Sequence, residues 1–294
     1  MNAYCEPRPV LFQPTDRADI QHLLTCEGEE QQALFQAARA ARQAAGMDAV
    51  KLRGVIELSN YCQKTCDYCA IRPQNKEMIR YRMDADAILA ITAEIVAEGI
   101  TTVFLQSGQD PKSDAIVLEA IPRIRQADVN VLLNLGEKSR AMYARYVEAG
   151  ADSYILKFET SDPVMYQNIV GTPLAKRLEC ARWIKEVGMK LGTGNIIGLP
   201  DQTLDTLVDD ILLAQELQPD FVSSSPFIPN ENTPLENLGV GDLQLTLNSI
   251  AICRLLFPHA LIPAVSALEK IKKGGQLMGL NAGANVLTIN FTPK

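Results

Sequence analysis

The sequence lacks the long hydrophobic runs of a membrane protein. No stretch reaches the roughly 18 consecutive apolar residues that a membrane-spanning helix needs. Residues Met1 to Pro14 contain no basic head followed by an apolar run, so the sequence shows no secretion signal. These absences argue against a membrane partner and predict a cytoplasmic location.

An excess of positive charge is also missing. The 294 residues include 28 Lys and Arg against 35 Asp and Glu, which gives a formal net charge of −7. A nucleic-acid-binding domain needs a basic patch, so no nucleic-acid partner is expected. A small-molecule substrate stays open, because its recognition is decided inside a pocket. The hydrophobic content of 47% is enough to fill the core of a single α/β barrel of this length.

From residue 51 onward, short runs rich in Val, Ile and Leu alternate with amphipathic segments. This alternation is typical of repeated βαβ units around a parallel sheet. The expected strands are Gly54–Leu58, Thr102–Leu105, Val129–Leu133, Tyr154–Lys157, Lys190–Ile197, Phe221–Ser224, Leu261–Val265 and Asn285–Ile289. The expected helices between them are Ala85–Glu98, Asp114–Gln126, Ser139–Ala149, Ala175–Val187, Leu204–Leu217, Leu243–Phe257 and Leu268–Leu280.

Eight strands and seven intervening helices predict an α/β fold of the (β/α)8 TIM-barrel type, with a doubly wound sheet as the alternative. Residues 1–50 are predicted as an N-terminal helical segment, and residues 51–294 as the barrel. Too few residues follow the last expected strand for an eighth helix.

Three of the seven cysteines, Cys62, Cys66 and Cys69, fall within eight residues with the spacing C-x3-C-x2-C. They follow the first expected strand, on a loop at the carboxyl-terminal face where barrel enzymes place their chemistry. In a cytosolic chain such crowding indicates metal binding or catalysis rather than disulfides. Three thiolates can bind three irons of a 4Fe–4S cluster and leave the fourth iron open to a ligand.

The cysteine spacing has two other interpretations. A structural zinc site needs four closed ligands, but the chain has only His22 and His259, and neither lies near the three cysteines. Three unrelated buried cysteines at this spacing are the second alternative. The remaining cysteines are expected to be ordinary small apolar residues. They are Cys5, Cys26, Cys180 and Cys253.

The cysteine loop resembles that of the radical S-adenosylmethionine (SAM) superfamily. In that family the open iron chelates the amino and carboxylate groups of SAM, and an electron from the cluster breaks a carbon–sulfur bond to give a 5′-deoxyadenosyl radical. The resemblance implies an enzyme with a 4Fe–4S cluster, SAM, and a small-molecule substrate in the barrel cavity. It also implies an electron donor such as ferredoxin or flavodoxin.

Several positions match the family's contacts with SAM. Tyr68 matches an aromatic residue that packs on the adenine. Gln106 and Ser107 belong to a segment that resembles the family's Gly-Gly-Glu motif for the methionine amino group. In this segment Gln109 stands where an acidic residue is common, and Asp110 could compensate.

The later strands carry the remaining matches. Glu159 matches a carboxylate that binds the amino group or ribose, and Arg177 could grip the methionine carboxylate through a two-pronged hydrogen bond. Ile196 lies in a segment, Gly194–Pro200, whose backbone would pair with the adenine edge. Lys157 and Glu159 are the candidate catalytic residues. Each match has an alternative interpretation. Arg177 could be a surface arginine, Glu159 a solvent-facing loop carboxylate, and Tyr68 an ordinary packing residue of the loop.

Within the superfamily, the sequence resembles most the group of the FeFe-hydrogenase maturase HydE and methylornithine synthase. The resemblance covers about Lys51 to Pro293 and includes the blocks Arg80–Met83, Gly198–Thr203 and Gly283–Asn285. Lys157 departs from it, since the maturase usually presents an arginine there. Three functions follow as hypotheses: HydE-like maturation of the hydrogenase cofactor, a methylornithine-synthase-like mutase or a paralogue with another small substrate, and a non-catalytic iron–sulfur carrier.

Overall fold

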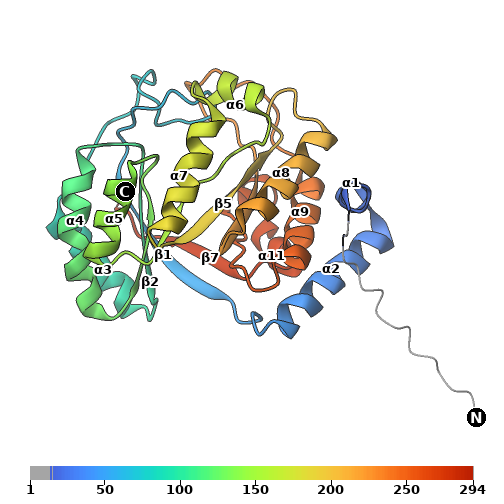
Figure 1. The fold of residues 1–294 in the computed structure, drawn as a ribbon, viewed down its shortest axis with the longest axis horizontal. Helices are drawn as coiled ribbons and strands as arrows, with labels where there is room; N and C mark the ends of the chain where they lie inside the picture. The colour runs from blue at the N-terminus through green and yellow to red at the C-terminus, as the bar shows by residue number, and fades with distance from the viewer. Residues whose placement is uncertain (1–13, 15, 294) are drawn as a thin grey trace, which may run out of the picture.

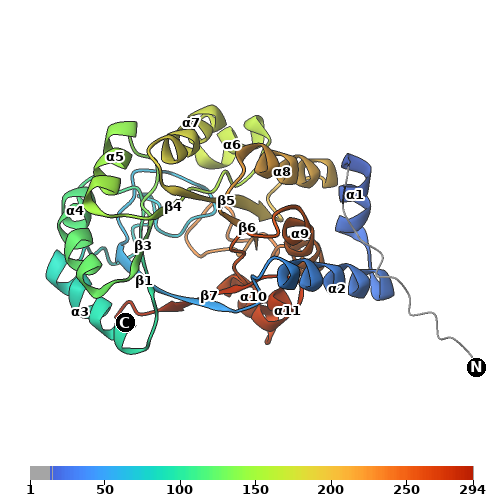
Figure 2. The same ribbon diagram turned by 60° about the horizontal axis from the view of Figure 1, so that its bottom comes forward.

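The protein is described by a computed structural model that covers residue 14 and residues 16–293. Its centre is one curled sheet of parallel strands with helices on the outer side (Figures 1 and 2). The strands are β1 (Lys51–Ser59), β2 (Thr102–Ser107), β3 (Asn130–Asn134), β4 (Ser153–Ile155), β5 (Lys190–Ile197), β6 (Phe221–Pro226) and β7 (Val286–Asn290). Their order in the sheet is β6-β5-β4-β3-β2-β1-β7, and all pairs are parallel. The α/β class and the parallel sheet agree with the sequence prediction.

The helices alternate with the strands as expected from the sequence. They are α3 (Ala85–Ala97), α4 (Ser113–Ile124), α5 (Arg140–Ala149), α6 (Pro163–Val170), α7 (Leu174–Glu186), α8 (Leu204–Leu217), α9 (Leu243–Leu256), α10 (Ser266–Ile271) and α11 (Gly275–Asn281). Caps explain several boundaries: the Asp84 carboxylate accepts a hydrogen bond from the Ala87 N–H at the start of α3, and Gly150 ends α5 at φ +112°. None of the helices in the described part of the chain is long and apolar enough to span a membrane.

Two further helices, α1 (Arg17–Thr25) and α2 (Gly28–Ala44), precede the sheet. Both pack against α9, and Figure 2 shows α2 beside α9 and α11. Asn248 of α9 is fully buried at this contact, where its amide donates to the Leu24 and Cys26 carbonyls. The division into a segment 1–50 and a barrel 51–294 stays a prediction.

The expected strand Leu261–Val265 was wrong as a strand. This segment forms only isolated bridges, from Leu261 to Phe221 of β6 and from Pro263 to Val286 of β7. Proline has no N–H to give to a ladder, which interrupts regular pairing at residue 263. The described residues therefore contain seven named strands rather than eight. The segment 261–265 bridges the two edge strands, β6 and β7, near their amino ends.

The helical prediction after this segment also needs correction. The expected helix Leu268–Leu280 is divided into α10 and α11, because Gly274 adopts φ +81° between them. The Glu269 carboxylate accepts the Gly274 and Gln276 N–H groups and so stabilises the turn. Helix α6 was not predicted, although Asp162 caps it and Pro163 occupies its first turn.

One glycine of β5 shows how tightly the sheet is packed. Gly194 has φ +151°, and a Cβ at this position would lie 1.8 Å from the Ser223 carbonyl oxygen of the neighbouring strand. The sheet curls around an internal cavity of about 140 Å³, which we call the lumen cavity. Its lining comes from β1 to β6 and from the bridging segment, and includes Arg53, Gln106, Asn134, Lys157, Thr193 and Ser225.

Candidate active site

The three cysteines lie on the long loop between β1 and α3, at the carboxyl ends of the strands. This cysteine loop, residues 60–83, is found at the top of Figure 1 beside α6. The Asp67 N–H donates to the Ile169 carbonyl of α6 over 2.8 Å. The Arg80 guanidinium donates to four loop carbonyls, at 2.5 to 3.0 Å. They belong to Asn60, Ile71, Arg72 and Asn75. The loop therefore has a fixed backbone despite containing no regular element.

The cysteine side chains differ in burial. Cys66 is buried, whereas Cys62 and Cys69 are half-buried. Burial raises the pKa of Cys66 to about 12 and that of Cys69 to about 11. Metal binding must therefore release protons from both thiols. The Cys62 sulfur accepts the N–H groups of Lys64 and Gln109, at 3.4 and 3.3 Å, and such bonds stabilise a thiolate ligand.

The three cysteines of the loop are the candidate metal ligands of the described residues. Within the described residues, no three His, Cys, Asp or Glu side chains are placed to hold one metal ion. The described cysteines are all free thiols, and Cys26, Cys180 and Cys253 are buried away from the loop. Cys5 lies outside the described residues.

Gly108, directly after β2, allows the cysteine loop to approach the sheet. A Cβ at this position would lie 2.3 Å from the Tyr61 carbonyl oxygen and 2.6 Å from the Cys62 Cβ. Real Cβ atoms do not make such contacts, so any larger residue at 108 must displace the loop.

Gln109 connects the cysteine loop to the loop after β3. Its carbonyl accepts the Gln63 N–H, and its side-chain oxygen accepts the Glu137 N–H over 3.0 Å. Asp110, which was expected to compensate for a missing acid at 109, is engaged elsewhere. Its carboxylate accepts two hydrogen bonds from Arg82, at 2.6 and 3.0 Å, and the hydroxyls of two serines. Asp110 is therefore a structural partner of Arg82.

A buried ion network that was not predicted from the sequence has Glu137 at its centre. The Glu137 carboxylate lies 2.9 Å from Lys64 Nζ of the cysteine loop and 3.0 Å from Arg177 Nε of α7. The Arg177 Nε also donates to the Tyr166 hydroxyl over 2.8 Å. A signal for it in the sequence is the position of Glu137 just after an expected strand.

Arg177 is well placed to bind an anion. Burial alone lowers its pKa, but the neighbouring Tyr166 and Glu137 outweigh burial and raise the pKa, so the guanidinium stays charged. Among the described residues, its two terminal amino groups have no hydrogen-bond partner. A carboxylate can take two parallel hydrogen bonds from such a pair of donors.

Glu159 stands just past β4 in a strained conformation. Its φ is +66°, which is uncommon for a residue other than glycine, and its backbone bonds to Gly194 and Ile196 hold it there. Its buried Oε2 lies 3.1 Å from Lys157 Nζ but accepts no well-aligned hydrogen bond, and Glu137 Oε1 is left in the same state. Buried carboxylate oxygens without aligned donors are rare in proteins and are expected where a ligand supplies the donors.

Tyr68 and Ile196 come together in one apolar cluster. Its other members are Met165, Ile169, Leu199, Leu235 and Phe227. Burial raises the pKa of Tyr68 well above its ordinary value, so the phenol stays neutral. The Ile196 N–H donates to the Glu159 carbonyl, and the Ile196 carbonyl accepts from the Gln202 side-chain amide. Both backbone groups are therefore engaged, and the apolar side chain of Ile196 is the part left to contact a ligand.

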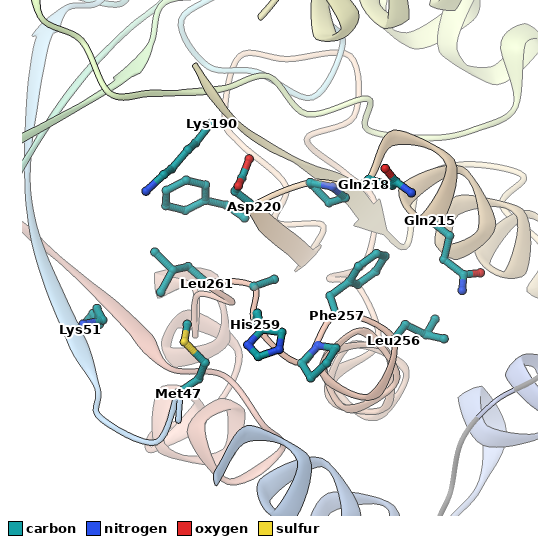
Figure 3. A pocket seen from close by; sticks show the side chains of 14 residues that line it. Met47, Lys51, Lys190, Gln215, Gln218, Asp220, Leu256, Phe257, His259 and Leu261 are labelled. Carbon is teal, nitrogen blue, oxygen red and sulfur yellow. The ribbon is translucent and has the colours of Figure 1, made fainter. Parts of the chain in front are cut away.

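The predicted residues do not all line one cavity. Gln106 and Lys157 line the lumen cavity, whereas the Ser107 hydroxyl donates to the Gly108 carbonyl over 2.7 Å. A larger cavity of about 590 Å³ lies at the amino ends of β5 and β6 (Figure 3). Residues such as Lys190, Asp220 and His259 line it, and no predicted site residue does. Cavity size alone therefore does not locate the cysteine chemistry.

Residues 56–214 of the chain match the family model described as the Radical SAM superfamily. The chain belongs to the radical SAM superfamily. Members of this superfamily are enzymes that use a 4Fe–4S cluster and SAM. The expectation of both cofactors is therefore confirmed at the level of the family.

Individual relatives narrow this placement. The chain is 41% identical over 265 residues to the [FeFe] hydrogenase maturase subunit HydE of Thermotoga maritima, an alignment that covers 90% of this chain and 76% of the relative. It is 31% identical over 284 residues to 3-methylornithine synthase of Methanosarcina acetivorans, covering 94% and 79%. The crystal structure of methylornithine synthase (PylB) superposes with a TM-score of 0.82 at 27% identity, covering 93% of this chain and 82% of that one.

Proposed function

We propose that this radical SAM enzyme performs a HydE-like step in maturation of the FeFe-hydrogenase, acting on a small molecule in the lumen cavity. The observation that carries the proposal is the 41% identity to HydE across 90% of the chain. The cluster and SAM, when bound, supply reductive cleavage of a carbon–sulfur bond. A ferredoxin or flavodoxin is the proposed electron donor.

The residues fit this function in distinct roles. Cys62, Cys66 and Cys69 are proposed as the cluster ligands, since they share one loop at the carboxyl end of the sheet and form no disulfide. Arg177 is proposed to bind the methionine carboxylate of SAM through its free amino groups. Glu159 would accept hydrogen bonds from the SAM amino group or ribose through its buried Oε2.

The remaining roles follow from position. Tyr68 and Ile196 would form the apolar wall for the adenine, since they share one cluster. Gln106 and Ser107 would face the methionine end of SAM. Lys157, which lines the lumen cavity and pairs with Glu159, would bind the substrate and hold it toward SAM.

Complementation tests this function directly. A strain that lacks its own HydE is supplied with this chain, and hydrogen evolution by its FeFe-hydrogenase is measured. Restored activity that disappears with Cys66→Ala and persists with Cys26→Ala supports the proposal, because Cys26 lies at the α1–α2 junction, outside the cysteine loop. A well-expressed chain with an intact cluster that restores nothing would contradict it.

A mutase like methylornithine synthase is the second candidate, favoured by the 31% identity and the TM-score of 0.82. Lysine is then the substrate to test. Purified enzyme is reduced without oxygen and given SAM with and without lysine, and 5′-deoxyadenosine and a lysine isomer are quantified. A lysine isomer favours the mutase. An intact, reducible cluster that binds no SAM favours instead the non-catalytic carrier.

A further inference from the structure

An apolar and basic surface lies over the cysteine loop. Ile79 is 88% exposed and Tyr61 is 41% exposed, so the loop presents apolar side chains to solvent. The Ile79 carbonyl accepts a hydrogen bond from the Asn60 side-chain amide over 2.8 Å. This bond holds the exposed tip against Asn60, which lies two residues before Cys62. Arg80, the next residue, donates to carbonyls on the same loop. The exposed tip is therefore held rigidly beside a proposed cluster ligand.

An open pocket leads from this surface to Cys62. It measures about 390 Å³, and Tyr61, Cys62, Arg82 and Lys112 are among its lining residues. The Arg82 guanidinium lies 4.6 Å from the centre of the Tyr61 ring and pairs with Asp110, so it holds the ring in place. Cys62 is thus a proposed ligand that borders a solvent-facing pocket, whereas Cys66 is buried.

This surface carries exposed cations that form no ion pair in the described residues, although the chain as a whole is acidic. The cysteine loop contains five Lys and Arg residues but only Asp67 and Glu77 as acids, in a chain of net charge −7. Lys76 and Lys112 are exposed and form no ion pair within the part of the chain that is described. Asp67 is paired with Arg72 at 2.9 Å, so exposed Glu77 is the one loop acid left without such a partner there.

We infer that the surface formed by Tyr61, Lys76, Ile79 and Lys112, here called the docking surface, binds an acidic one-electron carrier protein of the flavodoxin or ferredoxin class. The inference rests on the proposed cluster in the cysteine loop. The carrier loses one electron and the cluster gains it, with no bond made or broken. Free cations around an exposed apolar tip suit a small, salt-sensitive contact that forms fast and separates fast.

Zero-length crosslinking tests the contact itself. Reconstituted holoenzyme and a recombinant flavodoxin are joined with a carbodiimide, which links lysines to carboxylates in direct contact, and the linked peptides are identified by mass spectrometry. Links from Lys76 and Lys112 to flavodoxin are expected. Lys272 and Lys273, in the turn between α10 and α11, are exposed control lysines and should remain unlinked. Links that avoid both Lys76 and Lys112 would overturn the inference.

Reduction kinetics provide an independent readout. The bimolecular rate constant for cluster reduction by reduced flavodoxin is measured in stopped flow for Lys76→Glu/Lys112→Glu and for the matched control Lys272→Glu/Lys273→Glu. The first variant should be slower by about tenfold at low salt, with the difference shrinking at high salt, and Glu77→Lys should be faster than wild type. The control should behave as wild type.

Dithionite separates the two proposals. This small reductant needs no docking surface, so it should reduce the cluster equally in all variants. Equal rates with flavodoxin for Lys76→Glu/Lys112→Glu and wild type would overturn the docking surface while leaving the proposed function intact. A wild-type protein that assembles no cluster reducible by dithionite would overturn the proposed function and, with it, this inference.

Discussion

The Lys64 Nζ lies 2.9 Å from the Glu137 carboxylate, and about a tenth of each side chain is exposed. This pair joins the cysteine loop to the loop after β3, and Arg177 extends the connection to α7. Because Lys64 stands between Cys62 and Cys66, the position of the proposed ligands depends on a carboxylate more than seventy residues away in sequence. The same carboxylate orients Arg177 for its proposed contact with SAM.

Removal of the Glu137 charge should destabilise the protein. Glu137→Gln leaves Lys64 and Arg177 buried without a counter-ion, and breaking a buried pair costs about 3 kcal/mol in the free energy of unfolding. Urea denaturation of the cluster-free protein measures this difference. Glu119→Gln removes an exposed pair with Arg123 and should change the free energy by less than about 1 kcal/mol. Equal effects of the two variants would show that the Glu137 network contributes no special stability.

A methyl group at residue 108 should disturb cluster assembly. Gly108→Ala places a Cβ against the Tyr61 carbonyl and the Cys62 Cβ, so the cysteine loop must move. We expect lower iron content per protein after anaerobic reconstitution, measured together with the visible absorbance of the cluster. Gly239→Ala is the control, because no atom lies within 4 Å of its added Cβ. Normal iron content in Gly108→Ala would mean that the loop adapts without losing the cluster.

The geometry of the Arg177 guanidinium should matter for SAM binding beyond its charge. Arg177→Lys keeps a cation but loses the two parallel donors, and a lost charge-assisted hydrogen bond of about 1.5–3 kcal/mol predicts roughly ten- to hundredfold weaker binding. Anaerobic calorimetry of SAM binding to holoenzyme measures this change. Arg182→Lys, on an exposed part of α7, should bind SAM as wild type does. An unchanged affinity in Arg177→Lys would assign the SAM carboxylate to another residue.

Stability should depend on pH through Asp210. This carboxyl is 1% exposed and accepts hydrogen bonds from the Asn195 side-chain amide and the Ser161 N–H. Burial raises its pKa to about 6. Since the folded pKa is raised above the unfolded value of about 3.9, the protonated form favours folding. Its stabilising contribution is present below about pH 4 and is lost as the pH rises through about 6, at a cost of about 3 kcal/mol.

Asp210→Asn removes this titration. The variant should gain stability relative to wild type between about pH 4 and pH 7, as measured by urea denaturation across that range. Glu216→Gln, at an exposed position of the same helix α8, serves as the control and should leave the pH dependence of wild type intact. A constant difference between Asp210→Asn and wild type at all pH values would contradict the raised pKa.

Local patterns in the chain were enough to predict much of the fold. The alternation of apolar runs with amphipathic segments located seven strands, because each strand of a parallel sheet is buried on both faces and reads as a short apolar run. Asp84 and Gly150 marked helix ends through caps that act within a few residues. At Leu261–Val265 the same apolar pattern predicted a strand that does not form. Pro263 interrupts the pairing, and the segment makes only isolated bridges to the two sheet edges.

The sequence by itself determined the superfamily and the proposed cluster ligands, because C-x3-C-x2-C places three thiols on one loop regardless of the rest of the chain. Only the tertiary structure decided which distant residues meet this loop. Three such contacts join residues from separate βα units. They are the Glu137 ion network, the close approach of Gly108 to Cys62, and the packing of Tyr68 and Ile196 in one apolar cluster. No local periodicity encodes such pairs. They arise because a curled parallel sheet brings the carboxyl ends of all its strands to one face.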